Sequence, residues 1–302
     1  MNAIIISLVI QLVLLLIVAF LLYERSRQSK QAKIQLQSIY EQIEKKSLQI
    51  TGSINYAKRI QEAILPPQEE FQKFLPESFI FFKPKDVVSG DFYWVTKKDD
   101  LLIIVVADCV GHGIPGAFMS MIGNTLLNEI VNEKNIIQPD KVLKQMNQAI
   151  IKSLHQTNAQ LQTQEDGMDI AICTIDMKSR TLNFSGANHS AYIINNNKLD
   201  VIKGELFAIG GITKNLKKEF LVHTLTLAPD TCIYLFSDGF PDQFGGPGVS
   251  RKKYMTYRFK ELLLNVHHLP MLKQKQKLET ELTEWQGKQP QTDDMVVVGM
   301  KV

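Results

Sequence analysis

The sequence predicts an α+β domain in which two mostly antiparallel β-sheets pack face to face and are covered by helices. Short apolar runs of strand length recur between residues 78 and 302, a few longer segments have the 3.6-residue periodicity of helices, and turn residues join several strands directly. Runs of strands interrupted by helices are typical of layered domains. The full prediction is an α-β-β-α sandwich at 66–302, after a transmembrane helix at 1–23 and a helical coiled-coil linker at 24–65.

The N-terminal segment predicts a single transmembrane helix. Residues 3–22 carry no charge and only two polar side chains, Ser7 and Gln11, which is enough to cross a hydrocarbon core of about 30 Å. A cleaved signal peptide is the alternative, but no basic region precedes the apolar run. Basic residues follow it closely, namely Arg25, Arg27, Lys30 and Lys33. The positive-inside rule therefore predicts a single-pass cell-membrane protein whose remaining chain is cytoplasmic.

The linker has a heptad pattern. One seam is apolar throughout and consists of Leu36, Ile43, Ile50, Ala57 and Ile64, while a second seam is half polar. This pattern favours a parallel coiled coil, and hence a homodimer, over the alternative of a lone amphipathic helix. Pro66 and Pro67 are expected to end the helix.

Nine strands and three helices are expected after the linker. The strands are 78–84, 90–97, 101–108, 168–177, 181–187, 190–196, 220–227, 231–238 and 295–302, and the helices are 117–133, 140–158 and 258–285. Asn195 to Asn197 read as a hairpin turn. On the first helix, the side chains expected to face the sheet are Phe118, Met121, Ile122 and Leu126.

Composition excludes several function classes. The 302 residues are 45% hydrophobic and 22% charged, and a net charge of +3 is too small to indicate nucleic-acid binding. The three cysteines lie in or beside apolar runs without a CxxC pair, namely Cys109, Cys173 and Cys232. Reduced thiols are expected, and the histidines do not cluster with them as zinc ligands.

Four aspartates stand against apolar, strand-like runs. They are Asp91 in SGDFYW, Asp108 in LLIIVVADCVGHGIPG, Asp238 in LFSDGF and Asp293 in QTDDM. Each alone could be a turn or helix-cap residue. Together they predict an oxygen-ligand site for two Mn²⁺ or Mg²⁺ ions, and a metal pair of this kind activates water and clamps a phosphoryl group. The predicted reaction class is phosphoester hydrolysis, because P-loop, Rossmann and serine-hydrolase motifs are missing.

These four motifs, in this order and spacing, resemble the metal-dependent type-2C protein serine/threonine phosphatases, and specifically their bacterial SpoIIE-like, membrane-tethered branch. The resemblance covers about residues 55–302 and includes INYAKRIQEAILPP before the domain. It implies that Asp108 bridges both metals and that the backbone carbonyl of Cys109 is a further ligand. Asp91 is implied for one metal, and Asp238 and Asp293 for the other.

The roles of several neighbouring residues stay open. Asp294 is expected to be a supporting or loop residue rather than a ligand. His112 is a candidate general acid, because imidazole exchanges protons near neutral pH, but a structural hydrogen bond is the alternative. Lys83 or Lys85 could bind the substrate phosphate. Asp166 and Asp169 are interpreted as surface carboxylates more readily than as ligands of a third metal, and Asn188 and His189 as a buried hydrogen-bonded pair or a loop near the site.

The resemblance also implies a partner: a phosphoprotein substrate carrying phosphoserine or phosphothreonine, with an anti-sigma-factor antagonist as candidate. The helix after GHGIPG is expected to be a switch element influenced by the linker. Two other functions stay open: a catalytically degenerate phosphoprotein-binding module at the membrane, and a metal-dependent nucleotidyl cyclase.

Overall fold

The computed structural model describes residues 2–156, 166–211, 218–247 and 251–302. The chain divides into two compact units, Met1–Tyr56 and Ala57–Val302. Helix α1 (Asn2–Ile64) makes up the first unit as far as Tyr56, and its last two turns belong to the second unit. An 18-residue window near the start of α1 has a mean hydropathy of 3.2. The helix is therefore long and apolar enough to cross a membrane. Further along, Leu36, Ile43 and Ile50 are 53, 58 and 59% exposed.

Two antiparallel sheets form the centre of the second unit. One contains, in spatial order, β2 (Phe92–Lys98), β3 (Leu101–Cys109), β4 (Gly167–Asp176), β5 (Thr181–Ala187) and β9 (His223–Thr226), with β8 (Ile209–Gly210) paired to β4. The other contains β1 (Ser78–Lys83), β13 (Met295–Lys301), β10 (Cys232–Phe236), β6 (Ala191–Asn195) and β7 (Lys198–Ile202). A small ribbon pairs β11 (Phe244–Gly245) with β12 (Lys252–Lys253).

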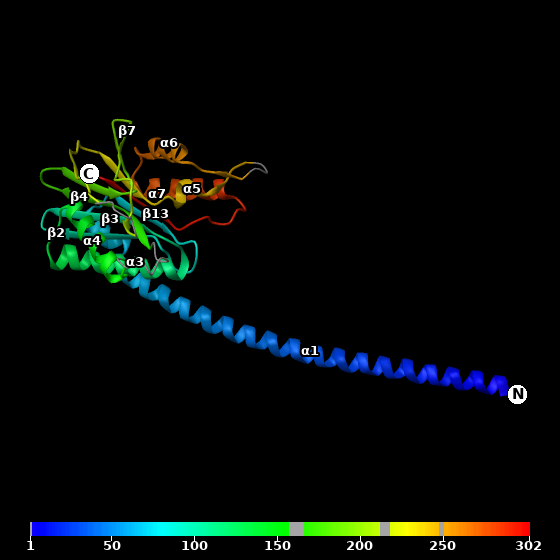
Figure 1. The fold of residues 1–302 in the computed structure, drawn as a ribbon. Coiled ribbons are helices and arrows are strands. Elements are labelled where there is room, and N and C mark those ends of the chain that lie inside the picture. Colours follow the sequence, from blue (N-terminus) through cyan, green and yellow to red (C-terminus); the bar gives the residue numbers. More distant parts are fainter. Residues whose placement is uncertain (1, 157–165, 212–217, 248–250) are drawn as a thin grey trace. The chain divides into compact units, whose positions relative to one another are not determined.

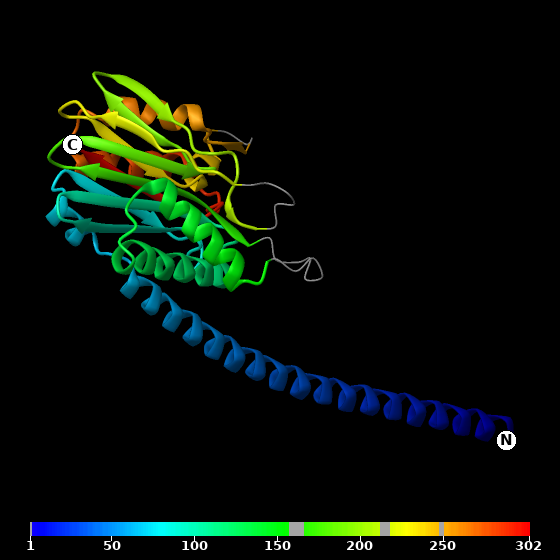
Figure 2. The same ribbon diagram turned by 60° about the vertical axis from the view of Figure 1, so that its left-hand side comes forward.

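Helices cover both outer faces of the sheet pair (Figures 1 and 2). On the side of the β2–β3 sheet lie α3 (Gly113–Leu127), which continues into the π-helical turn η1 (Asn128–Glu133), and α4 (Pro139–Ser153). On the other side lie α5 (Gly239–Asp242), α6 (Thr256–Val266) and α7 (Met271–Gln286). The short α2 (Gln68–Phe74) precedes β1. The predicted α-β-β-α sandwich is confirmed.

Strand β13 shows how the sequence produces this layering. Because side chains alternate across a strand, Val296, Val298 and Met300 enter the core between the sheets, whereas Met295 and Val297 pack in the second core beneath α6 and α7. A strand buried on both faces needs a continuous apolar run, and MVVVGM supplies one. The hairpin predicted at Asn195 to Asn197 joins β6 to β7, with Asn196 and Asn197 both in the left-handed region.

The structure corrects two predictions about helices. The helix expected at 258–285 is two helices, since Pro270 stands immediately before α7 and has no N–H to continue α6. The expected inward face of α3 is also wrong at Phe118. That side chain is 63% exposed, whereas Leu126 is buried. The apolar residues of α3 are too numerous for one face, so Phe118 and Ile114, four residues apart, form an exposed stripe.

The end of α1 is tied into the second unit by one buried side chain. Gln61 is 4% exposed. Its amide donates to the Ser89 carbonyl (2.7 Å) and the Ser120 hydroxyl (2.8 Å), and accepts from the Ser89 N–H (3.0 Å). Ser120 lies on α3, and Ser89 precedes β2 by three positions. One amide therefore joins α1, α3 and the segment before β2.

Replacing Gln61 with alanine should lower the free energy of unfolding of the second unit by about 1–3 kcal/mol, because buried polar groups of Ser89 lose their partner. Trp94 and Trp285, the only tryptophans of the chain, both lie in this unit, so their fluorescence in a urea titration of the full chain follows its unfolding. The control is Glu62→Ala, whose side chain is 61% exposed. Equal urea midpoints for the two variants would contradict the prediction.

Candidate metal centre

The four predicted aspartates reach one place from both sheets. Asp91 directly precedes β2 and Asp108 is near the end of β3, while Asp238 follows β10 at the start of α5 and Asp293 stands two residues before β13. Three of them line an open cleft of about 180 Å³, and Asp91 is buried beside it. The complete lining is Asp108, Cys109, Val110, Gly111, His112, Asp169, Asp238 and Asp293.

Asp108 lies at the centre of the carboxylates. Its carboxyl group lies close enough to those of Asp91 and Asp238 for their charges to act on it. Burial, and then the charges of Asp91 and Asp238, raise the pKa of Asp108 to about 10. Burial is also the largest cause that raises the pKa of Asp91 to about 8, and it raises the pKa of Asp238 as well. Without a cation, these carboxyl groups retain protons between them because neighbouring like charges in a buried site repel.

The donor set fits a hard divalent cation. Aspartate oxygens are the ligands that Mg²⁺ and Mn²⁺ prefer. Asp91 is 2% exposed, and its Oδ2 is a buried atom without a hydrogen-bond partner in the described part of the chain. Within the described residues, no three ligating side chains already surround a single point. The carboxylates instead contact one another, and a cation between them would replace those shared protons.

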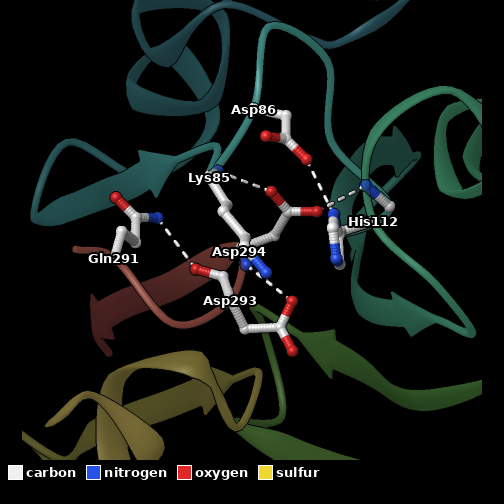
Figure 3. A network of polar contacts seen from close by, with 7 residues as sticks. Lys85, Asp86, His112, Gln291, Asp293 and Asp294 are labelled. Carbon is white, nitrogen blue, oxygen red and sulfur yellow. Dashed lines mark hydrogen bonds and ion pairs between the residues drawn. The ribbon is translucent and has the colours of Figure 1, made fainter.

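Cys109 and His112 line the same cleft in different ways. Burial raises the pKa of the Cys109 thiol well above its usual range, so the thiolate is disfavoured and the predicted backbone carbonyl is the available donor. His112 stands just before α3 with its side chain 49% exposed. Its Nδ1 lies 2.7 Å from Oδ2 of Asp86, a partner that the sequence analysis did not identify (Figure 3). Asp86 has no strand-end motif that could have marked it.

The two aspartates of the TDD motif have different surroundings. Asp293 faces the cleft, and its Oδ1 accepts the N–H of Asp294 at 2.9 Å. Asp294 is 2% exposed, and its two carboxylate oxygens accept the backbone N–H groups of Lys85 and Gly90, each at 2.7 Å. Figure 3 shows the Asp294 carboxylate on the side of Lys85 and the Asp293 carboxylate pointing away from it.

Close backbone packing holds the Asp91 segment against α3. A Cβ atom at Gly116 would lie 2.2 Å from the Gly111 carbonyl oxygen and 2.7 Å from the Gly90 Cα. These contacts involve backbone atoms that cannot move aside, so a side chain at Gly116 would separate the GHG loop from the segment that bears Asp91.

The remaining candidates divide between the cleft and other places. Asp169, interpreted as a surface carboxylate, is partly exposed; it lines the cleft and accepts from Asn188 at 3.0 Å. Asp166 is not part of the lining. His189 is buried, and burial lowers its pKa to about 4, which keeps it neutral at physiological pH. Lys83 binds Gln286 at 3.3 Å and lines a separate groove.

No lysine or arginine is among the described residues that line the cleft. Bound cations would supply positive charge for a phosphoryl group there.

Comparisons with known proteins identify the family. The sequence profile described as Stage II sporulation protein E (SpoIIE) matches residues 98–302, more than half of the chain. The SiaA-PP2C domain of Pseudomonas aeruginosa has 32% sequence identity and a TM-score of 0.76, covering 85% of this chain and 98% of that one. The chain belongs to the SpoIIE family of PP2C-type phosphatases. A SpoIIE-family domain of this kind is a protein serine/threonine phosphatase, and the family is metal-dependent.

More distant solved structures share the fold of this SpoIIE-family domain. The PP2C domain of SpoIIE from Bacillus subtilis, solved with a fragment of its regulatory domain, has 17% identity and a TM-score of 0.59, covering 75% of this chain and 63% of that one. RsbX in complex with magnesium has 15% identity and a TM-score of 0.50, covering 74% and 94%. No curated protein sequence matches the chain.

The stability of the metal-free SpoIIE-family domain should fall as the pH rises from 6.5 to 8. Asp91 and Asp108 have pKa values raised above the ordinary 3.8, so the folded state holds more protons than the unfolded state in this window, and stability is lost as those protons leave. His189 acts in the opposite direction, but its contribution lies mostly below about pH 7, where the unfolded imidazole still binds a proton, and it is the smaller one in this window.

Thermal unfolding in EDTA followed by tryptophan fluorescence checks this prediction, and Asp108→Asn should flatten the slope. Added Mn²⁺ should stabilise the protein more at pH 8 than at 6.5, because the carboxylates must lose protons to bind it. A wild-type midpoint that rises over the same window without metal would contradict the assignment of raised pKa values.

Proposed function

We propose that this protein is a membrane-anchored phosphatase that removes phosphate from phosphoserine or phosphothreonine on a partner protein by means of two Mn²⁺ or Mg²⁺ ions. The observation that carries the proposal is the convergence of Asp91, Asp108, Asp238 and Asp293 on one open cleft. Asp108 contacts carboxylates from both sides, which suits a bridging ligand. An anti-sigma-factor antagonist is the candidate partner, on the basis of the family resemblance.

The ligands divide between the two sheets. Asp91 and the Cys109 carbonyl would serve one metal with Asp108, and Asp238 and Asp293 would serve the other. When bound, the metal pair supplies a water of lowered pKa and positive charge for the phosphoryl oxygens. The side chains would hold the ions in a fixed place, because each aspartate is attached at or near the end of a strand or the start of a helix.

His112 is proposed to donate a proton to the leaving seryl or threonyl oxygen. It lines the cleft and is half exposed, so a substrate can reach it. The Asp86 Oδ2 atom lies 2.7 Å from His112 Nδ1, and a hydrogen bond between them would fix the orientation of the imidazole ring. The other ring nitrogen, Nε2, is then left to face the substrate. The alternative is that His112 makes only a structural hydrogen bond, and a comparison of two substrates with the His112→Gln variant distinguishes the two roles.

The N-terminal helix supports the proposals on location and assembly. The apolar window of α1 would anchor the protein in the membrane, and the basic residues after it favour a cytoplasmic catalytic domain. Leu36, Ile43 and Ile50 share one side of the helix with more than half of each side chain exposed, as a coiled-coil homodimer needs. A degenerate binding module is disfavoured, because loss of metal ligands would be its expected mark and none of the four is lost.

The full chain in detergent should release phosphate from a phosphoserine peptide when Mn²⁺ is present, and Asp108→Asn should reduce kcat by at least about 100-fold, because the carboxylate common to both metal sites loses its charge. Malachite-green detection of free phosphate measures the rate, and EDTA should abolish it. A wild-type chain without activity, or an Asp108→Asn variant with wild-type activity, would refute the proposal.

The same assay with His112→Gln tests the proton donor. Phosphoserine needs a proton on its leaving oxygen, whereas p-nitrophenolate leaves without one. Loss of a general acid should therefore lower kcat on the peptide by on the order of 100-fold and affect p-nitrophenyl phosphate far less. Equal losses on both substrates would assign His112 a structural role.

A further inference from the structure

We propose that Asp294 is a positioning residue for the phosphatase reaction. Its carboxylate holds the loop of residues 84–90, and this loop carries Asp91 to the metals at one end and Asp86 to His112 in its middle. The inference rests on the proposed function. Asp294 acts through these residues and does not itself bind metal or substrate in this proposal.

The hydrogen bonds of Asp294 span the loop. One carboxylate oxygen accepts the N–H of Lys85 and the other accepts the N–H of Gly90, both at 2.7 Å. The two donors lie five residues apart, at the beginning and the end of the loop. Gly90 immediately precedes Asp91, so the bond to Gly90 fixes the backbone from which the Asp91 side chain extends. Bonds of this length to an ionised acceptor are among the stronger ones in proteins.

The same loop also determines where His112 is held. Asp86 is adjacent to Lys85, and its carboxylate contacts His112 Nδ1 at 2.7 Å. A Cβ atom placed on Gly113 would lie only 3.2 Å from Asp86 Oδ2, so the Asp86 side chain lies directly against the start of α3. A shift of the loop at Lys85 would therefore move both the proposed ligand Asp91 and the support of the proposed acid.

Asp294 contacts the remaining ligand segments through its backbone. It directly follows Asp293, whose side chain accepts its N–H. A Cβ atom on Gly239 would lie 1.9 Å from the Asp294 carbonyl oxygen, and Gly239 directly follows Asp238. The residue thus touches the segments that bear Asp91, Asp238 and Asp293, from a site where it is 2% exposed.

An aspartate suits this position better than an asparagine. Two backbone N–H groups converge on the side chain, and a carboxylate offers an acceptor to each, whereas an amide offers one acceptor and a second donor. Asp294→Asn has nearly the same shape, so it replaces one hydrogen bond with a donor facing a donor and leaves the volume unchanged.

The test compares Asp294→Asn with wild type by hydrogen exchange and by metal binding, both on the full chain in detergent. In EDTA, exchange of the peptide that covers residues 84–91 should become about tenfold faster in the variant, while peptides from β3 and β4 stay unchanged. The Kd for Mn²⁺ from calorimetry should weaken by about 10- to 100-fold, as for other residues that support metal ligands. In the phosphatase assay, saturating Mn²⁺ should restore part of the kcat that the Asp294→Asn variant loses.

The matched control is Tyr234→Phe, which removes another buried hydrogen bond of this unit, from Tyr234 to Gln274 at 2.6 Å, and touches none of the proposed ligands. It should change neither the 84–91 exchange nor the Kd. Equal exchange and Kd in Asp294→Asn and Tyr234→Phe, or uniformly faster exchange over all peptides, would overturn the proposal.

If Asp294→Asn does not fold, wild-type exchange alone decides: the 84–91 peptide must contain three slowly exchanging amides, those of Lys85 and Gly90 on Asp294 and that of Ser89 on Gln61, and fewer than three refute the inference. Because exchange is measured without metal, its outcome is independent of whether the wild-type chain proves to be an active phosphatase.

Discussion

The repulsion among clustered carboxylates, of which Asp91 is fully buried, is the constraint on which this structure depends. Asp91, Asp108, Asp238 and Asp293 come from the ends of two facing sheets, and the charges of Asp91 and Asp238 help to raise the pKa of Asp108. A fold built only for stability gains nothing from such a cluster. The cluster becomes favourable when cations neutralise it, so the free energy of metal binding and the stability of the domain are coupled.

The sandwich architecture makes the convergence possible. Each sheet alone delivers two of the aspartates, and only the face-to-face packing of strands such as β3 and β13 brings the pairs together. Around them the backbone is packed without room for side chains at Gly90 and Gly116. Gln61 adds a third element, since its amide links the end of α1 to Ser89 beside this same segment. Within the second unit, the cleft is thus joined to the last two turns of α1 through three consecutive residues, Ser89 to Asp91.

Much of the fold could be predicted from local sequence patterns, because apolar runs such as LLIIVVAD and MVVVGM are buried on both faces, and aspartates stand at the end of the first and just before the start of the second. The ligand candidates followed from those strand ends. The position of Phe118 was predicted wrongly, because periodicity alone does not tell which of several apolar residues on α3 lacks a partner. Asp86 was not identified, and the particular contacts of Asp169 and Asp294 could not be predicted, since they arise between segments distant in sequence.

The central claim is that two cations occupy this cleft with Asp108 between them. Anomalous diffraction at the manganese edge, from crystals of the wild-type chain grown with Mn²⁺, tests it directly. The account predicts two peaks about 3.5–4 Å apart, both within ligand distance of Asp108, with Asp91 on one side and Asp238 and Asp293 on the other. A cleft without anomalous density, or a single peak away from Asp108, would contradict it.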